Sequence, residues 1–317
     1  MNRSTEDRRS RVLLQHAAAA GAIQLPDFIS QVGHVEAARL IGDGTAPAMH
    51  VPPLHRRITW QDTDRVLKRA EARGIRFVIP GDDEWPTDQI ADLAALSEVQ
   101  EGTGGVPLGL WIRGRQQLNK IVRRGVTVSG TTVPSAYGSF AASEISFGLA
   151  SAGCPVWSSG SVGIDEAGHR GVLASDSGVP VAVLPSGLDV RHPHHRDVWL
   201  DMIAERGAVV SQFPPTVLVT RARATVSRWL CCALTTAVVV IETGRRGAQH
   251  SLARSASALQ RPVFAVPGPI GSAPSAGCHQ LIMDGTAKLI TTATDILDCL
   301  DTGSADAGGE DAGPRSV

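Results

Sequence analysis

Short apolar runs alternate with helical patterns over the second half of the chain. The runs are rich in β-branched residues and lie at 126–130, 155–159, 180–185, 208–212, 237–242, 262–268 and 288–290. Such continuous runs are typical of parallel strands that are buried on both faces. The helical patterns between them lie at 137–152, 164–177, 195–206, 225–234, 249–260, 278–284 and 293–300. The alternation predicts an α/β fold, with a Rossmann-like, doubly wound and mostly parallel sheet.

The pattern also divides the chain into four segments. Residues 1–58 are Ala-rich and helical in pattern, and we expect a small helical N-terminal domain there. Residues 59–125 hold one more helical pattern, an apolar run at 76–80 and an acidic loop, and form a connecting segment that starts the Rossmann region. Residues 126–301 are the expected Rossmann-like domain. The last segment, 302–317, is rich in Gly, Ala and Asp and should be disordered.

Composition excludes several classes of protein. The chain has 317 residues, 43% of them hydrophobic, and a formal net charge of −1, so it can bury a sizeable core. It contains no apolar run of the roughly 20 residues that a membrane helix needs, and its charged start predicts a first helix, not a signal peptide. Five cysteines without CxxC spacing argue against a zinc site or a disulfide framework. We therefore expect a cytoplasmic location, no metal and no cofactor.

Small and polar residues follow the predicted strands at the positions where an α/β sheet binds ligands. Gly130-Thr131-Thr132 follows the first strand, Ser159-Gly160-Ser161 and Gly163 follow the second, and Arg245-Arg246-Gly247 follows the fifth. Ligands of doubly wound sheets lie beyond the carboxyl ends of the strands, and exposed backbone N–H groups there attract anions. None of these loops is a GxGxxG or P-loop motif, so a P-loop ATPase is not supported.

Positive charge gathers around one of these loops. Residues 217–261 contain seven arginines and a single acidic residue, Glu242, although the whole chain is close to neutral. This imbalance beside a Gly-rich loop indicates a polyanionic partner. Tyr137 and Trp229 are candidates for stacking on bases. Asp165 and His169 lie at a helix start, but no nucleophile accompanies them, so we expect no catalytic residue.

Several motifs taken together resemble the DNA-processing protein A (DprA, also called Smf) family, in an actinobacterial form. They are RFVIPGDDEWP (76–86), GLWIRG (109–114), GIDEAGHRGVLA (163–174), VPVAVLPSGLDVRHPHHR (179–196), ERGAVVSQFPP (205–215) and VFAVPGPIGSAPSAGCHQLIMDGTAKLI (263–290). The resemblance implies a dimeric protein that is not an enzyme. It also implies binding of single-stranded DNA and help in loading RecA recombinase onto that DNA during natural transformation.

The expected nucleic-acid contacts combine the loops with the arginines around them. They are Gly130, Thr131, Thr132, Ser159, Gly160, Ser161, Gly163, Asp165, His169, Arg170, Arg228, Arg245, Arg246 and Gly247.

The sequence departs from the family pattern at some of these positions, which keeps two alternatives open. The family usually has an arginine where this chain has Thr132, and Arg246-Gly247-Ala248-Gln249-His250 replaces its Arg-Ser-Gly-Ala-Leu. One alternative is a nucleotide-sensing paralogue that has lost part of its DNA site. The other is a nucleotide phosphoribohydrolase, but its PGGxGTxxE motif is absent from this chain.

Overall fold

A computed structural model describes residues 3–20, 25–47, 58–99 and 106–306 of the chain. Contacts between residues group the chain into two compact units, one of residues 1–122 and 180–234 and one of residues 123–179 and 235–317. Each unit is described by itself below. Across the described ranges, no helix combines the length and the apolar character that crossing a membrane requires.

The first unit begins with three helices that share one small core. They are α1 (Arg3–Ala19), α2 (Leu25–Val32) and α3 (His34–Gly42). Leu13 and Leu14 of α1 pack with Phe28 of α2 and Ile41 of α3, and all four side chains are buried. The Ala-rich start of the chain is therefore helical, as its pattern predicts. Helix α4 (Trp60–Glu71) follows. It begins with a capping box, in which the side chains of Thr59 and Asp62 each accept the backbone N–H of the other residue.

Four strands of the first unit lie in the order β1-β2-β6-β5. They are β1 (Ile75–Val78), β2 (Leu110–Gly114), β5 (Pro180–Val183) and β6 (Ala208–Ser211). Strand β6 pairs with β5 in parallel, whereas β2 pairs antiparallel with both β1 and β6. The helices that complete the unit are α5 (Thr87–Val99), α6 (Leu118–Ile121), α9 (His194–Arg206) and α10 (Arg221–Leu234).

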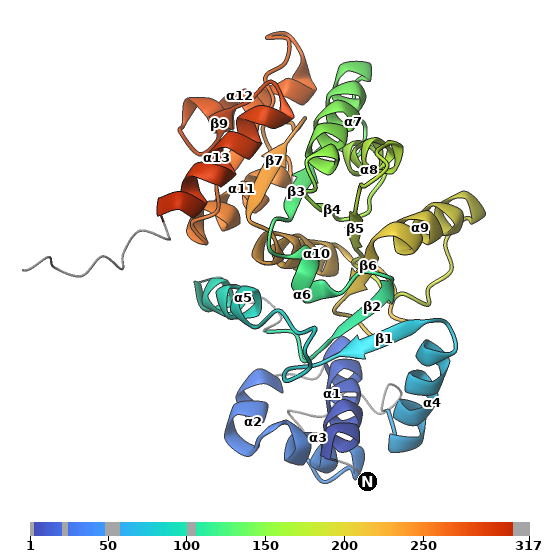
Figure 1. The fold of residues 1–317 in the computed structure, drawn as a ribbon. Helices are drawn as coiled ribbons and strands as arrows, with labels where there is room; N and C mark the ends of the chain where they lie inside the picture. Colours follow the sequence, from blue (N-terminus) through green and yellow to red (C-terminus); the bar gives the residue numbers. More distant parts are fainter. Residues whose placement is uncertain (1–2, 21–24, 48–57, 100–105, 307–317) are drawn as a thin grey trace, which may run out of the picture. The chain divides into compact units, whose positions relative to one another are not determined.

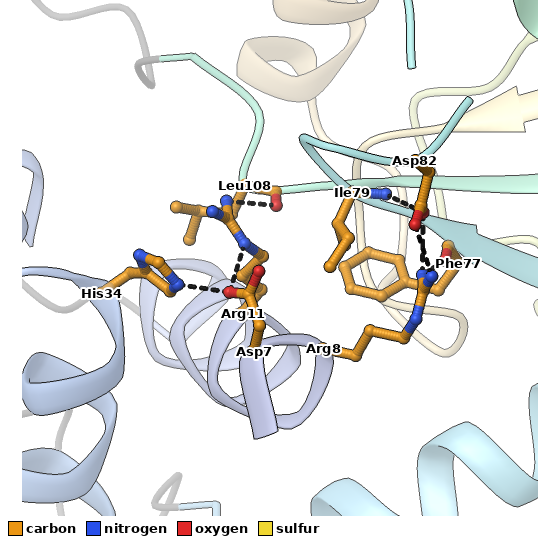
Figure 2. A network of polar contacts seen from close by, with 8 residues as sticks. All are labelled: Asp7, Arg8, Arg11, His34, Phe77, Ile79, Asp82 and Leu108. Atoms are coloured by element: carbon orange, nitrogen blue, oxygen red, sulfur yellow. Dashed lines mark hydrogen bonds and ion pairs between the residues drawn. The ribbon is translucent and has the colours of Figure 1, made fainter. Parts of the chain in front are cut away.

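A polar network ties α1 to strand β1 and to the segment before β2 (Figure 2). Arg8 donates to both carboxylate oxygens of Asp82, at 2.9 and 2.6 Å, and to the carbonyl oxygen of Phe77 at 2.5 Å. Asp82 also accepts the backbone N–H of Ile79 at 2.9 Å. Arg11 bridges Asp7 and the carbonyl oxygen of Leu108 in the same network. These bonds satisfy polar backbone groups at β1, which is the end strand of the sheet.

The second unit is a parallel sheet with the strand order β4-β3-β7-β8-β9 (Figure 1). The strands are β3 (Val126–Ser129), β4 (Val156–Ser158), β7 (Ala237–Val240), β8 (Val263–Ala265) and β9 (Lys288–Leu289). Helix α7 (Ala136–Ser151) connects β3 to β4, and α11 (Gln249–Ala258) connects β7 to β8. Because the strand order reverses between β3 and β7, the carboxyl ends of these two strands form a topological switch point.

Helices cover both faces of this parallel sheet. Helix α7 packs with α8 (Ile164–Ala174) and α13 (Ala293–Asp306) around one core that includes Val128, Ile145 and Ile296. Helix α11 contacts β7 and β8, and α12 (Ala276–Met283) contacts β8. Right-handed crossovers in opposite directions place α7 and α11 on opposite faces. The predicted α/β class with a mostly parallel sheet is therefore confirmed.

The main differences from the sequence prediction lie in the first unit and at the C-terminus. Strand β2 was not predicted as a strand, and α5 covers part of a segment that the sequence suggested was a loop. Residues 302–306 continue α13, although the tail was expected to be disordered from 302, and 307–317 lie outside the described residues. The predicted helical domain 1–58 includes 48–57, which also lie outside them. The division into four segments stays a prediction.

Candidate nucleic-acid interface

Three loops of the second unit meet at the switch point between β3 and β7. Gly163, in the loop after β4, has φ +89° and lies so close to the loop after β3 that an added Cβ would stand 2.5 Å from the Thr131 carbonyl oxygen. Only glycine adopts this backbone without strain and leaves that space. Gln249, at the start of α11, donates to the carbonyl oxygen of Gly130 at 2.5 Å. The loops that the sequence placed along one edge are thus in contact.

A buried glutamate occupies the start of α7 at this point. Glu242 follows β7, is 1% exposed, and accepts the Ser135 backbone N–H at 2.9 Å and the Ser135 hydroxyl at 2.6 Å. Ser135 Oγ in turn accepts the N–H of Gly138 at 3.0 Å, as an N-cap residue does. Gly138 has no room for a side chain, because a Cβ there would overlap the Glu242 carboxylate. The protein's own carboxylate therefore fills the position where a helix start would otherwise bind an external anion.

Asp165 and His169 form hydrogen bonds to the loop after β4 from the buried side of that loop. Asp165 accepts the hydroxyl of Ser159 at 2.5 Å and the N–H groups of Ser159 and Ser161 at 3.1 and 3.4 Å. His169 contacts the hydroxyl of Ser158 at 3.4 Å. Asp165 is 3% exposed and His169 is 0% exposed. These two predicted contact residues fix the shape of the loop and do not face solvent.

Many backbone N–H groups of these loops already have partners within the protein. The N–H of Thr131 donates to the Glu242 carbonyl oxygen at 2.7 Å, that of Gly160 to Ser158 Oγ at 3.0 Å, and that of Gly247 to the Gly244 carbonyl oxygen at 2.9 Å. Within the described part of the chain, no such partner is found for the N–H of Thr132, Arg245 or Arg246, and all three residues are exposed. The set of amides that could bind an anion is therefore smaller than the glycine content of the loops suggested.

Arginine side chains supply most of the positive charge at this edge. Arg245 and Arg246 form the exposed turn after β7, and neither guanidinium has a hydrogen bond or an ion pair to another described residue. Arg170 is 71% exposed but is paired with Glu166 at 2.5 Å. Arg228, which donates to the Thr225 hydroxyl at 3.0 Å, belongs to α10 of the first unit. The site of the second unit is therefore built without Arg228.

Of the two aromatic candidates, Tyr137 lies at this edge. Its ring is 43% exposed and its hydroxyl donates to the Pro267 carbonyl oxygen, in the loop after β8, at 2.7 Å. Burial, together with the nearby Glu242 and Cys278, raises the pKa of Tyr137, so its hydroxyl stays protonated at neutral pH. Trp229 lies on α10 of the first unit and is half-buried. Sequence reasoning noted Glu242 but missed its capping role, although an acidic residue directly after a buried apolar strand was a usable signal.

The chain resembles known proteins over most of its length. The family described as DNA recombination-mediator protein A matches residues 76–301. A putative DNA processing protein DprA of Mycobacterium tuberculosis (strain H37Rv) is 36% identical over 293 residues, which cover 92% of this chain and 74% of that protein. DNA processing protein DprA of Streptococcus pneumoniae (strain R6) is 30% identical over 216 residues, or 68% of this chain and 71% of that protein.

Solved structures show the same fold. The X-ray structure of DprA from Streptococcus pneumoniae aligns with a TM-score of 0.66 at 23% identity, over 93% of this chain and 96% of that one. DNA processing protein A from Helicobacter pylori aligns with a TM-score of 0.59 at 20% identity, over 72% and 96%. With a family match over most of its residues, and with a relative 36% identical over nearly its whole length, this chain belongs to the DNA recombination-mediator protein A family.

Proposed function

We propose that this protein binds single-stranded DNA and acts in DNA processing, with the carboxyl edge of the parallel sheet in the second unit as its contact surface. The observation that carries the proposal is the exposed turn Arg245-Arg246, which has no counter-charge among the described residues and projects from the switch point. Guanidinium groups pair well with phosphates and carry a permanent charge. The exposed N–H groups of Thr132, Arg245 and Arg246 add donors at the same edge.

A single strand fits this edge better than a duplex. The half-exposed ring of Tyr137 lies at the same edge and can stack on an unpaired base, whereas bases in a duplex are already stacked on each other. The solved structure of the Helicobacter pylori relative is described as showing a single-stranded DNA binding mode of that protein. These two facts support single-stranded DNA as the ligand of the present chain.

The alternative of a small-nucleotide sensor is less consistent with the geometry. In doubly wound folds, a nucleotide phosphate usually sits on the N-terminus of the helix at the switch point. Here the buried carboxylate of Glu242 holds that position, and a phosphate beside it would meet a like charge. We also propose a binding role without catalysis, because Ser158, whose hydroxyl contacts His169, is buried, and the Ser159 hydroxyl is held by a hydrogen bond to the buried carboxylate of Asp165.

Membership of the family extends the proposal to the partners of the protein. We propose that the chain works in the cytoplasm as a homodimer, contacts RecA recombinase and assists natural transformation. These roles rest on the family resemblance, whereas the DNA contact rests on the site described above.

Fluorescence anisotropy with a labelled oligo-dT strand tests the DNA contact. Each charge-assisted phosphate bond is worth about 1.5–3 kcal/mol, so Arg245→Glu and Arg246→Glu should each weaken binding roughly tenfold or more. Lys68→Glu, an exposed residue on α4 of the first unit, makes the same charge change and should leave the affinity within about twofold. Unchanged affinity in both arginine variants, or equal affinity for a duplex of the same sequence, would show that the proposed surface is not the DNA site.

A further inference from the structure

The exposed aromatic side chains of the described residues all lie on one helix. They are Tyr137, Phe140 and Phe147 of α7, whose exposed fractions are 43%, 64% and 42%. The other aromatic residues of the chain are buried or half-buried. Residues three or four apart share one side of a helix, so Tyr137 and Phe140 are neighbours and Phe147 lies two turns beyond Phe140 on that side. Exposed aromatic surface that is concentrated on one side of one helix indicates a binding site.

Two of these rings lie at the switch point. Tyr137 is the second residue of α7, and an added Cβ on Gly268, in the loop after β8, would lie 3.7 Å from its ring. Phe140 follows one turn later. Side chains of an α-helix point back toward its N-terminus, so the ring of Phe140 leans over the first turn, beside Tyr137. Both rings therefore lie at the carboxyl edge of the sheet, and we call these two residues the aromatic pair of α7.

The turn Arg245-Arg246 belongs to the same edge. Gly138, which lies between the two residues of the aromatic pair in sequence, packs against the carboxylate of Glu242. Glu242 precedes Arg245 by three residues, and three residues of chain span at most about 10 Å. The aromatic pair and the exposed guanidinium groups are thus close enough for one DNA strand to contact both.

An exposed carboxylate limits the aromatic pair along the helix. Glu144 lies four residues after Phe140 and three before Phe147, on the same side of α7, and it forms no ion pair with another described residue. A DNA phosphate at this point would meet a like charge, whereas the face of a base carries no charge. A strand on this side of α7 therefore has to turn its bases toward the helix and its phosphates away from it. Phe147 lies beyond Glu144 and outside the surface that such a strand covers.

We propose that a DNA strand bound at the switch point stacks its bases on the aromatic pair of α7, while its phosphates lie on the turn Arg245-Arg246. This arrangement rests on the proposed function and extends it, because it adds Phe140 as a contact residue and determines which side of the strand faces the helix. Every base has a face that can stack on an aromatic ring, so binding should require bases without reading their sequence. It also requires unpaired bases, which excludes a duplex from this surface.

Two strands of about 10 nucleotides test the arrangement in fluorescence anisotropy, one of oligo-dT and one of the same length without bases, because they carry the same phosphates. The wild type should bind the dT strand at least roughly tenfold more tightly than the abasic strand. Phe140→Ala should weaken binding of the dT strand roughly tenfold and leave the abasic strand within about twofold. Phe140→Trp, which keeps an aromatic ring, should bind the dT strand within about twofold of the wild type.

The variants of the cationic turn should behave differently from Phe140→Ala. Arg246→Glu should weaken binding of both strands and lower the slope of log affinity against log salt by about 0.7, whereas Phe140→Ala should leave that slope unchanged. Phe147→Ala is the matched control, because it removes an exposed ring from the same side of α7 beyond Glu144, and both strands should then bind within about twofold of the wild type. Thermal unfolding verifies that each variant is folded.

The outcomes separate the two proposals. If the wild type binds the abasic strand as tightly as the dT strand, or if Phe140→Ala weakens neither strand or both equally, the arrangement with the bases on α7 is wrong. It is also wrong if Phe147→Ala weakens dT binding as much as Phe140→Ala. If neither Arg245→Glu nor Arg246→Glu weakens binding of either strand, or if the wild type binds neither strand, the proposed function itself is wrong. Weaker binding of the dT strand alone in Phe140→Ala, with weaker binding of both strands in Arg246→Glu, supports both proposals.

Discussion

Replacing Glu242 by glutamine should destabilise the second unit, although the change alters only one charge. The carboxylate of Glu242 accepts two hydrogen bonds from Ser135, and both lie at the start of α7, where the helix dipole favours a negative group. The two Ser135 donors go to different oxygens of the carboxylate, and glutamine replaces one of these oxygens by an NH2 group that only donates, so one of the two donors loses its acceptor. The loss of one charge-assisted bond corresponds to about 1.5–3 kcal/mol of unfolding free energy.

Urea unfolding and thermal unfolding measure this loss. For a chain of this size we expect the melting temperature of Glu242→Gln to fall by roughly 2–5 °C. Glu144→Gln provides a matched control, because Glu144 lies on the exposed side of the same helix, and its substitution should change stability by less than about 0.5 kcal/mol. If Glu242→Gln were as stable as Glu144→Gln, the carboxylate would not be what holds the start of α7, and it would no longer exclude a nucleotide phosphate from that position.

Two further predictions concern other positions. Burial lowers the pKa of His16 from 6.5 to about 4, against a smaller opposing effect of Asp62, so only the unfolded chain takes up this proton as pH falls from 6.5 to 4. The folded state should lose up to about 3 kcal/mol across that window. Urea unfolding at pH 7 and pH 4.5 should show a smaller loss for His16→Gln than for the wild type, and parallel losses would contradict the assignment. Gly163→Ala should lower the melting temperature by several degrees and weaken oligo-dT binding, because it strains a left-handed backbone and pushes against Thr131. A Gly153→Ala variant, with φ +78° but open space around it, should affect stability and leave binding unchanged.

The parallel strands could be predicted from the sequence because a strand that is buried on both faces appears there as a continuous run of apolar residues. The run at 237–242 contains β7, all of whose residues are buried, and the run at 180–185 contains β5 in the same way. Strand β2 left a weaker signal, since its five residues end in the half-buried Arg113 and Gly114. Helix α5 was missed because its first turn follows an acidic, Pro-containing stretch that is typical of a loop.

The candidate site shows a different limit of sequence reasoning. The glycines indicated correctly where loops follow strands, and Gly163 does allow two loops to touch. What they could not indicate was the direction of each N–H group. Ser159 and Ser161 donate inward to Asp165 a few residues further along the chain, and Thr131 donates to Glu242 in a distant loop. Such pairings depend on the three-dimensional course of each loop.

The first unit is built from two separate stretches of chain, and this has a consequence for its synthesis. Strand β2 pairs with β6, and Trp111 lies opposite Ser211 in this pairing. The ribosome must therefore synthesise the residues between them, which include a large part of the other unit, before β2 can pair with β6. During this interval β2 has no neighbour on one side, and its Leu110, Trp111 and Ile112 have no completed core. The nascent chain is therefore most exposed to aggregation before residue 211 emerges, and shielding by a chaperone would matter most in that window.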